Sequence, residues 1–334
     1  MILRRAGLLA LAIASAAPLH AQPLLAPLPA PVAAQPAADL AQRLAAIANL
    51  PVGRAGIAVI DLSTGRETTI SGLERFPMAS TVKLAVAAAY LAEVDAGRRS
   101  LGKMITLDES IRSGSDGIGR LMPHPGVTLS AANLIELMLV VSDNSATDML
   151  IADLGGVGAV QRWIDRNRIS GIRIDRTIAR LVLDNLGLSM LPGKTAAQTL
   201  WASDPLGVAE RAVAVAKFDI DPRDSATPLA MARFLARLDK GELLSAASRI
   251  LLFEIMARCR TGLDRIPGAL PPGTPTLHKT GTLAGISNDV GIVTLPDQRR
   301  FAIAVFTRGI ADGPARARII ADASRAAFDS LTAR

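Results

Sequence analysis

Ser80 and Lys83 are the residues of this 334-residue chain whose types and spacing are best suited to chemistry. They lie three positions apart in the stretch PMASTVKL (77–84), and this spacing places two side chains on one face of a helix. A serine hydroxyl is a weak nucleophile at neutral pH unless a neighbour takes its proton, and a lysine with a lowered pKa can do so. The pair therefore predicts an activated serine that attacks a carbonyl carbon.

Two further motifs in the sequence contain hydroxyl, amide or ammonium side chains of the same kind. Ser142-Asp143-Asn144 lies in the middle of the chain, and Lys279-Thr280-Gly281 lies toward its C-terminal end. The chain has only six lysines against thirty-one arginines, and two of the six are Lys83 and Lys279. Since arginine serves a solvated surface equally well, lysine at these positions indicates a need for a compact ammonium group that can titrate.

The three motifs, in this order, resemble those of the penicillin-recognising serine enzymes, most closely the class A β-lactamases. The resemblance extends from about residue 40 to the end of the chain. It implies an α+β fold with three layers (α/β/α), in which both chain ends build a five-stranded antiparallel sheet. An all-helical subdomain, approximately residues 80–270, is expected to be inserted between them.

The resemblance also implies a role for each catalytic residue. Ser80 would attack the carbonyl carbon of a lactam or peptide, Lys83 would accept its proton, and Ser142 would pass a proton to the leaving nitrogen. The backbone N–H groups of Ser80 and Thr282 would form the oxyanion hole, because the edge of a sheet can present amides to a substrate.

Substrate binding is expected to involve the remaining motif residues. Asn144 would hold the amide side chain of the substrate, and Lys279 with Thr280 would hold its carboxylate. Gly281 would let the substrate approach the backbone. Asp143 is expected to brace its loop without taking part in the chemistry.

One segment departs from the family pattern. Class A enzymes carry Arg-x-Glu-Pro in their omega loop, and this glutamate activates the water that hydrolyses the acyl-enzyme. Here Arg176 matches the arginine, but Ile178 occupies the glutamate position, and no glutamate occurs from Leu137 to Ala209. Asp184 is the candidate for a substitute base at a shifted position.

This departure leaves several functions open. The leading hypothesis is a β-lactamase that hydrolyses the lactam amide and so confers antibiotic resistance. The alternatives are a D-alanyl-D-alanine peptidase-like hydrolase, in which Lys83 also activates the deacylating water, and a penicillin-binding protein that stays acylated at Ser80. A serine–histidine–aspartate triad fits poorly, since His278 directly precedes Lys279 on an expected strand and its side chain would point to the opposite face.

Three neighbouring features allow more than one interpretation. Asp148 is either a surface acid or the counterpart of a family position, often asparagine and sometimes aspartate, that orients the deacylating glutamate. Ser287-Asn288-Asp289 is interpreted as a turn. Arg316 and Arg318 either add positive charge near the substrate carboxylate or belong to a solvated face.

The elements that must position these residues can be predicted from periodicity and turn signals. Residues 55–62 and 66–70 form a predicted hairpin, and 286–295 and 300–307 are predicted strands. Helices are expected at 38–50, 129–141, 144–154, 227–238 and 314–331.

The N-terminal residues show the pattern of an export signal. Arg4 and Arg5 precede an apolar run from Gly7 to Ala17, with a cleavage position near Ala21. We therefore expect a signal peptide at 1–21, a proline- and alanine-rich tether at 22–37 and one domain at 38–334. The mature protein is expected to be periplasmic or secreted, with no membrane anchor.

The composition of the chain limits the ligands and partners that we expect it to bind. The net charge is +7, but aromatic residues make up 3% of the chain, so few stacking platforms for nucleic acid bases exist. The single cysteine, Cys259, is expected to be a small buried residue, and histidines are too few for a zinc site. We expect no cofactor or metal, no nucleic acid partner, a monomer, and a β-lactam or cell-wall peptide as substrate.

Overall fold

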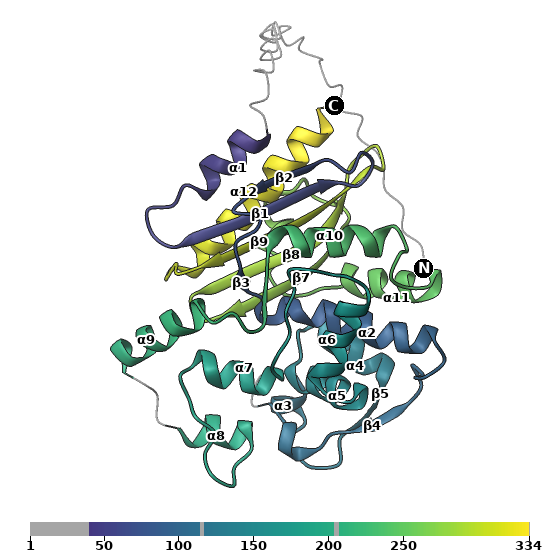
Figure 1. Cartoon of the computed structure of the whole chain (residues 1–334), viewed down its shortest axis with the longest axis vertical. Helices are drawn as coiled ribbons and strands as arrows, with labels where there is room; N and C mark the ends of the chain where they lie inside the picture. The colour runs from purple at the N-terminus through teal and green to yellow at the C-terminus, as the bar shows by residue number, and fades with distance from the viewer. Residues whose placement is uncertain (1–39, 114–116, 204–206, 334) are drawn as a thin grey trace, which may run out of the picture. The chain divides into compact units, whose positions relative to one another are not determined.

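A five-stranded antiparallel sheet forms the centre of the protein (Figure 1). The computed structural model describes residues 40–113, 117–203 and 207–333, so the expected signal peptide and tether lie outside the described residues. The strand order is β2-β1-β9-β8-β7. The strands are β1 (Arg54–Asp61), β2 (Glu67–Ile70), β7 (Thr276–Leu283), β8 (Ile286–Thr294) and β9 (Arg300–Arg308).

Helices cover both faces of this sheet because its strands are apolar on both sides. Along β1, Ile57 and Val59 pack with α1 (Leu40–Ala48) and α12 (Gly313–Thr332). The alternate residues Ala58 and Ile60 belong to the larger core, with α2 (Val82–Asp95) and α10 (Pro228–Asp239). The α+β fold with three layers is thereby confirmed.

The segment inserted between β2 and β7 is mostly helical. In addition to α2 and α10 it contains α3 (Ile118–Leu121), α4 (Ala131–Val140), α5 (Asn144–Leu154), α6 (Val157–Arg166), α7 (Ile178–Asn185), α8 (Ala196–Ala202), α9 (Val208–Asp219) and α11 (Ala246–Ala257). Two short ribbons also occur, β3 (Phe76–Pro77) with β6 (Ser225–Ala226) and β4 (Met104–Thr106) with β5 (Thr128–Ser130). The segment is therefore not purely helical, and α10 packs on β1 and β9 of the sheet.

Local sequence explains where the helices that matter for the site begin. The carboxylate of Asp143 accepts the N–H of Ala146 at 2.6 Å and caps α5. Thr177 caps α7 through the N–H of Arg180. In α2, every residue from Val82 to Leu91 is buried, so this helix runs through the core and carries Lys83 with it.

The expected turn at Ser287-Asn288-Asp289 is wrong. These residues lie in β8, paired with Thr282, Gly281 and Thr280 of β7, and the turn consists of Ala284 and Gly285. Their polar side chains are buried and hydrogen-bonded internally, which is why polarity misled the prediction. Asn288 donates to the carbonyl oxygens of Pro77 at 2.8 Å and Met78 at 3.1 Å, and so ties β8 to the chain just before Ser80.

Among the helices in the described ranges, none has the length and apolar character needed to cross a membrane.

Candidate active site

Ser80 lies in a short 3-10 helix (Ala79–Thr81) at the start of α2, directly beside the edge strand β7. Ala79 has a φ of +49°, a strained conformation for a residue with a side chain. At Gly281 of β7, an added Cβ would lie 2.5 Å from the Met78 carbonyl oxygen and 3.2 Å from the Ser80 nitrogen. Gly281 therefore allows β7 to approach the chain that carries the serine. The expectation was that Gly281 would let the substrate approach the backbone.

Ser142 joins two lysines that are fully buried. Lys83 Nζ donates to the Ser142 carbonyl oxygen at 2.6 Å and to Asn144 Oδ1 at 2.6 Å, and lies 3.2 Å from Ser142 Oγ. Lys279 Nζ donates to the same hydroxyl at 3.0 Å. The structure thus brings Lys83, Ser142, Asn144 and Lys279 together from α2, the α4–α5 loop, α5 and β7.

Burial of the two ammonium groups changes their acidity. Burial, followed by the charge of Lys279, lowers the pKa of Lys83 well below its ordinary value, although Asp143 and Asp148 act in the opposite direction. Burial also lowers the pKa of Lys279 to about 8, against the raising effects of Cys259 and Asp289. A lysine with a strongly lowered pKa is suited to accept a proton, and one with a pKa of about 8 stays mostly charged at neutral pH.

Asp143 braces the loop that holds Ser142. Its second carboxylate oxygen accepts the N–H of Ile118 at 2.6 Å, and Gly117 packs so closely that a Cβ there would collide with this carboxylate. Ser142 itself has a φ of +61°. The bracing offsets the strain of that conformation and directs Ser142 between the two lysines.

The hydroxyl groups of β7 contact the segment between α11 and the 3-10 helix η3 (Ile266–Ala269). Thr280 Oγ1 lies 2.5 Å from Thr261 Oγ1, and Arg265 Nη2 donates to Thr282 Oγ1 at 2.7 Å. Arg265 Nη1 also donates to the carbonyl oxygens of Gly281 at 3.1 Å and Asn288 at 2.9 Å. A guanidinium group therefore lies at the strand of the Lys-Thr-Gly motif.

Sequence reasoning missed Arg265. In the described part of the chain its guanidinium group donates to oxygens of Gly281, Thr282 and Asn288 and forms no ion pair with a carboxylate. Nothing in its spacing distinguishes it from the other arginines of the chain. Only the packing of its segment against β7 singles it out.

Asp148 is buried, so its interpretation as a surface acid is wrong. Its two oxygens accept the N–H groups of Ile178 at 2.7 Å and Ala179 at 2.9 Å, and it thereby anchors the first turn of α7. Burial raises the pKa of Asp148 to about 6, although these two hydrogen bonds act to lower it. The Ile178 side chain belongs to the hydrophobic core, so no carboxylate is present at that position.

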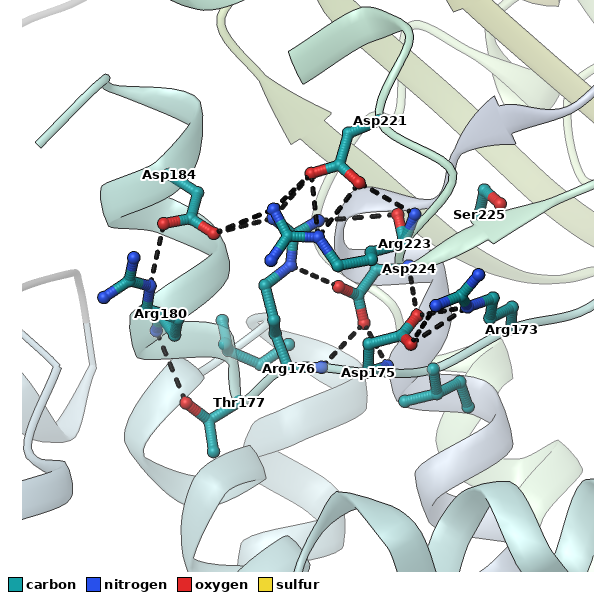
Figure 2. A network of polar contacts seen from close by, with 12 residues as sticks. Arg173, Asp175, Arg176, Thr177, Arg180, Asp184, Asp221, Arg223, Asp224 and Ser225 are labelled. Carbon is teal, nitrogen blue, oxygen red and sulfur yellow. Dashed lines mark hydrogen bonds and ion pairs between the residues drawn. The ribbon is translucent and has the colours of Figure 1, made fainter. Parts of the chain in front are cut away.

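Asp184 lies in an arginine cluster, shown in Figure 2. It forms ion pairs with Arg176 and Arg180, each at 2.8 Å, and a longer one with Arg223 at 3.6 Å. Arg176 also contacts Asp224 at 2.5 Å and Asp221 at 3.2 Å. These contacts group Asp184 with the arginines and not with the cluster around Ser142.

Arg316 and Arg318 differ in burial and in their contacts. Arg316 is buried and donates to Ser287 Oγ and to the Ala311 carbonyl oxygen, each at 2.9 Å, so it supports the start of α12. Arg318 is exposed. The interpretation of Arg316 as part of a solvated face is therefore wrong.

Comparison with known proteins gives several β-lactamases as relatives. The chain is 30% identical over 303 residues to β-lactamase CTX-M-8 of Citrobacter amalonaticus, covering 90% of this chain and 91% of that protein. It is 27% identical over 263 residues to β-lactamase VEB-1 of Pseudomonas aeruginosa, covering 76% of this chain and 77% of that protein. Among solved structures, the class A β-lactamase of the last common ancestor of Gram-negative bacteria matches with a TM-score of 0.72 and 31% identity, covering 88% of this chain and all of that one.

The model of the β-lactamase enzyme family matches residues 39–331, nearly the whole chain. This agrees with the sheet, the inserted helices and the buried lysines on either side of Ser142. The chain therefore belongs to the β-lactamase enzyme family, and it is a serine β-lactamase-type hydrolase of the class A kind.

Proposed function

We propose that this hydrolase acts on β-lactams through an acyl-enzyme formed on Ser80, with Lys83 as the base. The observation that carries this proposal is the fully buried Lys83, whose Nζ lies within hydrogen-bond distance of three uncharged oxygens of Ser142 and Asn144. Burial favours its uncharged amine, which then accepts the proton of the Ser80 hydroxyl as the carbonyl carbon is attacked.

Ser142 connects this proton to the leaving group. Its hydroxyl lies 3.2 Å from Lys83 Nζ, so a proton taken by Lys83 can pass to Ser142 and from there to the lactam nitrogen. Lys279 donates to the same hydroxyl oxygen, which keeps the Ser142 proton available for donation. Lys83 thus returns to its uncharged form once the ring nitrogen is protonated.

The edge strand supplies the groups that hold the substrate. The backbone N–H groups of Ser80 and Thr282 are the proposed oxyanion hole, supported by the close approach of Gly281 to the Ser80 nitrogen. Lys279, Thr280 and Arg265 are the proposed partners of the substrate carboxylate.

Asn144 is the proposed partner of the amide side chain of the substrate. Its Oδ1 already accepts a hydrogen bond from Lys83, which leaves its NH₂ group for a substrate carbonyl oxygen.

Lys83 is also the proposed base for hydrolysis of the acyl-enzyme. The other candidate, Asp184, forms ion pairs with three arginines of the cluster in Figure 2 and not with the groups around Ser142. Lys83 lies within the site and regains its uncharged form after acylation. A single base serving both steps is expected to make deacylation slow.

Ile178, which occupies the position of the deacylating glutamate, favours a second candidate function. This candidate is a penicillin-binding protein whose covalent adduct persists. The two candidates differ only in the rate at which water attacks the acyl-enzyme. Export to the periplasm or medium is also proposed, on the basis of the N-terminal sequence pattern, together with action as a monomer.

A time course of nitrocefin hydrolysis by the mature protein, read together with intact-protein mass, tests these proposals. Sustained turnover with little adduct supports hydrolysis, and one equivalent of product with a stable adduct supports the penicillin-binding candidate. Ser80→Ala should abolish the adduct and reduce turnover on the order of 10⁴-fold or more. Ser170→Ala, which changes an exposed serine, is the matched control. Labelling that survives in Ser80→Ala would refute the assignment of the nucleophile.

A further inference from the structure

A chain of side-chain groups leads from Cys259 to the edge strand. Cys259 Sγ lies 3.4 Å from Thr261 Oγ1, which lies 2.5 Å from Thr280 Oγ1. Gly262, the residue that follows Thr261, has a φ of +62°, and a Cβ there would lie 2.6 Å from Thr280 Cγ2. The segment is therefore pressed against Thr280, and either atom can be the donor in each link of the chain.

The number of hydroxyl protons restricts which group donates and which accepts in this chain. A hydroxyl group has one proton to donate. Thr280 can donate to a substrate carboxylate only while Thr261 donates to Thr280. Thr261 is free to do so when Cys259 is a thiol, which can itself act as a donor.

A thiolate reverses this direction. Because a thiolate only accepts, it draws the proton of Thr261, and the Thr261 oxygen in turn accepts the proton of Thr280. The Thr280 hydroxyl then presents no donor to the substrate. The ionisation of Cys259 is thus transmitted to the carboxylate site without any movement of the backbone.

We propose that Thr261 is a positioning residue for Thr280, and that the protonation of Cys259 sets whether Thr280 donates to the substrate carboxylate. This inference rests on the proposed role of Thr280. It predicts that carboxylate-bearing substrates bind more tightly to the thiol form than to the thiolate form.

The groups around Cys259 make this titration accessible. Burial raises the pKa of the thiol, but the hydrogen bond and charge of His278, followed by the charge of Lys279, lower it to about 7. His278 Nδ1 lies 3.0 and 3.1 Å from the two oxygens of Asp289 in β8. Burial lowers the pKa of His278, whereas the charge of Asp289 raises it to about 10, so the imidazolium stays charged across the neutral range.

The segment of Cys259 also carries Arg258, Arg260, Asp264 and Arg265, and Lys279 of β7 titrates too. Its loss of charge at higher pH also weakens carboxylate binding. The two titrations must therefore be separated with variants that remove the thiol and leave Lys279 in place.

The test is the pH dependence of KM for nitrocefin, or of the concentration that half-saturates acylation if turnover is slow. In the wild type we expect this value to rise about tenfold as pH increases through the neutral range, from the loss of one charge-assisted hydrogen bond. The maximal rate should change little. Ultraviolet absorbance of the thiolate, which is clean because the chain has one cysteine, should report titration over the same range.

Four variants separate the explanations. Cys259→Ala and Cys259→Ser should lose the increase in KM near neutral pH, here called the neutral step. They should keep only the increase in KM that comes from the loss of charge on Lys279 at higher pH. The two variants guard against a fault in the folding of either one. Thr261→Val, which breaks the chain but keeps the thiol, should also lose the step, and Thr261→Ser should restore it.

Two outcomes would overturn the inference alone. One is a neutral step that is unchanged in both Cys259 variants, and the other is a wild-type value that stays flat while acylation proceeds. By contrast, a wild-type protein that forms no adduct at any pH would refute the proposed acyl-enzyme, and this inference with it.

Discussion

Two clusters of buried positive charge differ in what surrounds them. Around Ser142, the ammonium groups of Lys83 and Lys279 meet hydroxyl, amide and carbonyl oxygens. In the arginine cluster of Figure 2, the guanidinium group of Arg176 meets three carboxylates. The cost of burying a charge is therefore relieved at Lys83 by loss of a proton and at Arg176 by ion pairing.

The pKa shifts express this difference. Burial and the charge of Lys279 lower the pKa of Lys83, and they outweigh the opposing charges of Asp143 and Asp148. Burial also acts to lower the pKa of Arg176, but the hydrogen bonds and charges of Asp224 and its neighbours outweigh this effect and raise it. A group of the first kind exchanges protons, whereas one of the second kind holds a fold together.

Among the variants that compare the two clusters, the one at Lys83 is expected to have the largest effect. Lys83→Met removes the proposed base while keeping a side chain of similar length, so acylation by nitrocefin should slow about 10³-fold. Stopped-flow absorbance with intact-protein mass measures this rate. Lys240→Met, at an exposed lysine, is the control. A loss of less than about tenfold would mean that another group takes the serine proton.

Arg176→Met tests the opposite cluster. Removing the guanidinium leaves Asp224 buried without its cation, so the free energy of unfolding should fall by about 3–5 kcal/mol. Arg180→Met breaks an ion pair of the same cluster from a half-exposed position and should cost less than about 1 kcal/mol. Denaturant unfolding measures both, and equal losses would show that burial does not distinguish the two arginines.

Lys279 should show its role in the pH profile. Since its charge holds the substrate carboxylate, kcat/KM should fall as pH rises through its pKa of about 8. In the Cys259→Ala background, which removes the step proposed for the thiol, Lys279→Arg, which stays charged, should remove this alkaline limb. Lys279→Ala should lower kcat/KM at neutral pH about tenfold to hundredfold. An alkaline limb that persists in Lys279→Arg would assign it to another group.

The smallest effect is expected for Asp184. Asp184→Asn should change the rate of deacylation less than about tenfold, compared with the 10²–10⁴-fold loss typical of a missing general base. The decay of the adduct, followed by mass after a pulse of penicillin, gives this rate. An adduct that decays more than about 10²-fold more slowly than that of the wild type would restore Asp184 as the deacylating base and move part of the chemistry into the arginine cluster.

Much of the fold was predictable because its signals are local. The hairpin of β1 and β2, the strands β8 and β9, and the helices α5, α10 and α12 lie where periodicity and turn residues place them. Asn144–Leu154 begins directly after its capping aspartate, Asp143. The interpretation of Ser287-Asn288-Asp289 as a turn was wrong because Asn288 and Asp289 satisfy their polar groups with partners far away in the sequence or across the strand pair.

The sequence by itself determined the three motifs, the scarcity of lysine and the missing glutamate at Ile178, because these depend only on residue identity and order. The tertiary structure decided which charges are paired. Asp184 and Asp148 both looked free in the sequence, yet one is held by arginines and the other by two backbone N–H groups. Arg265 and Thr261 likewise reach β7 only through folding. Burial and pairing depend on neighbours that are distant along the chain, and these two factors set whether a charged group reacts or only stabilises.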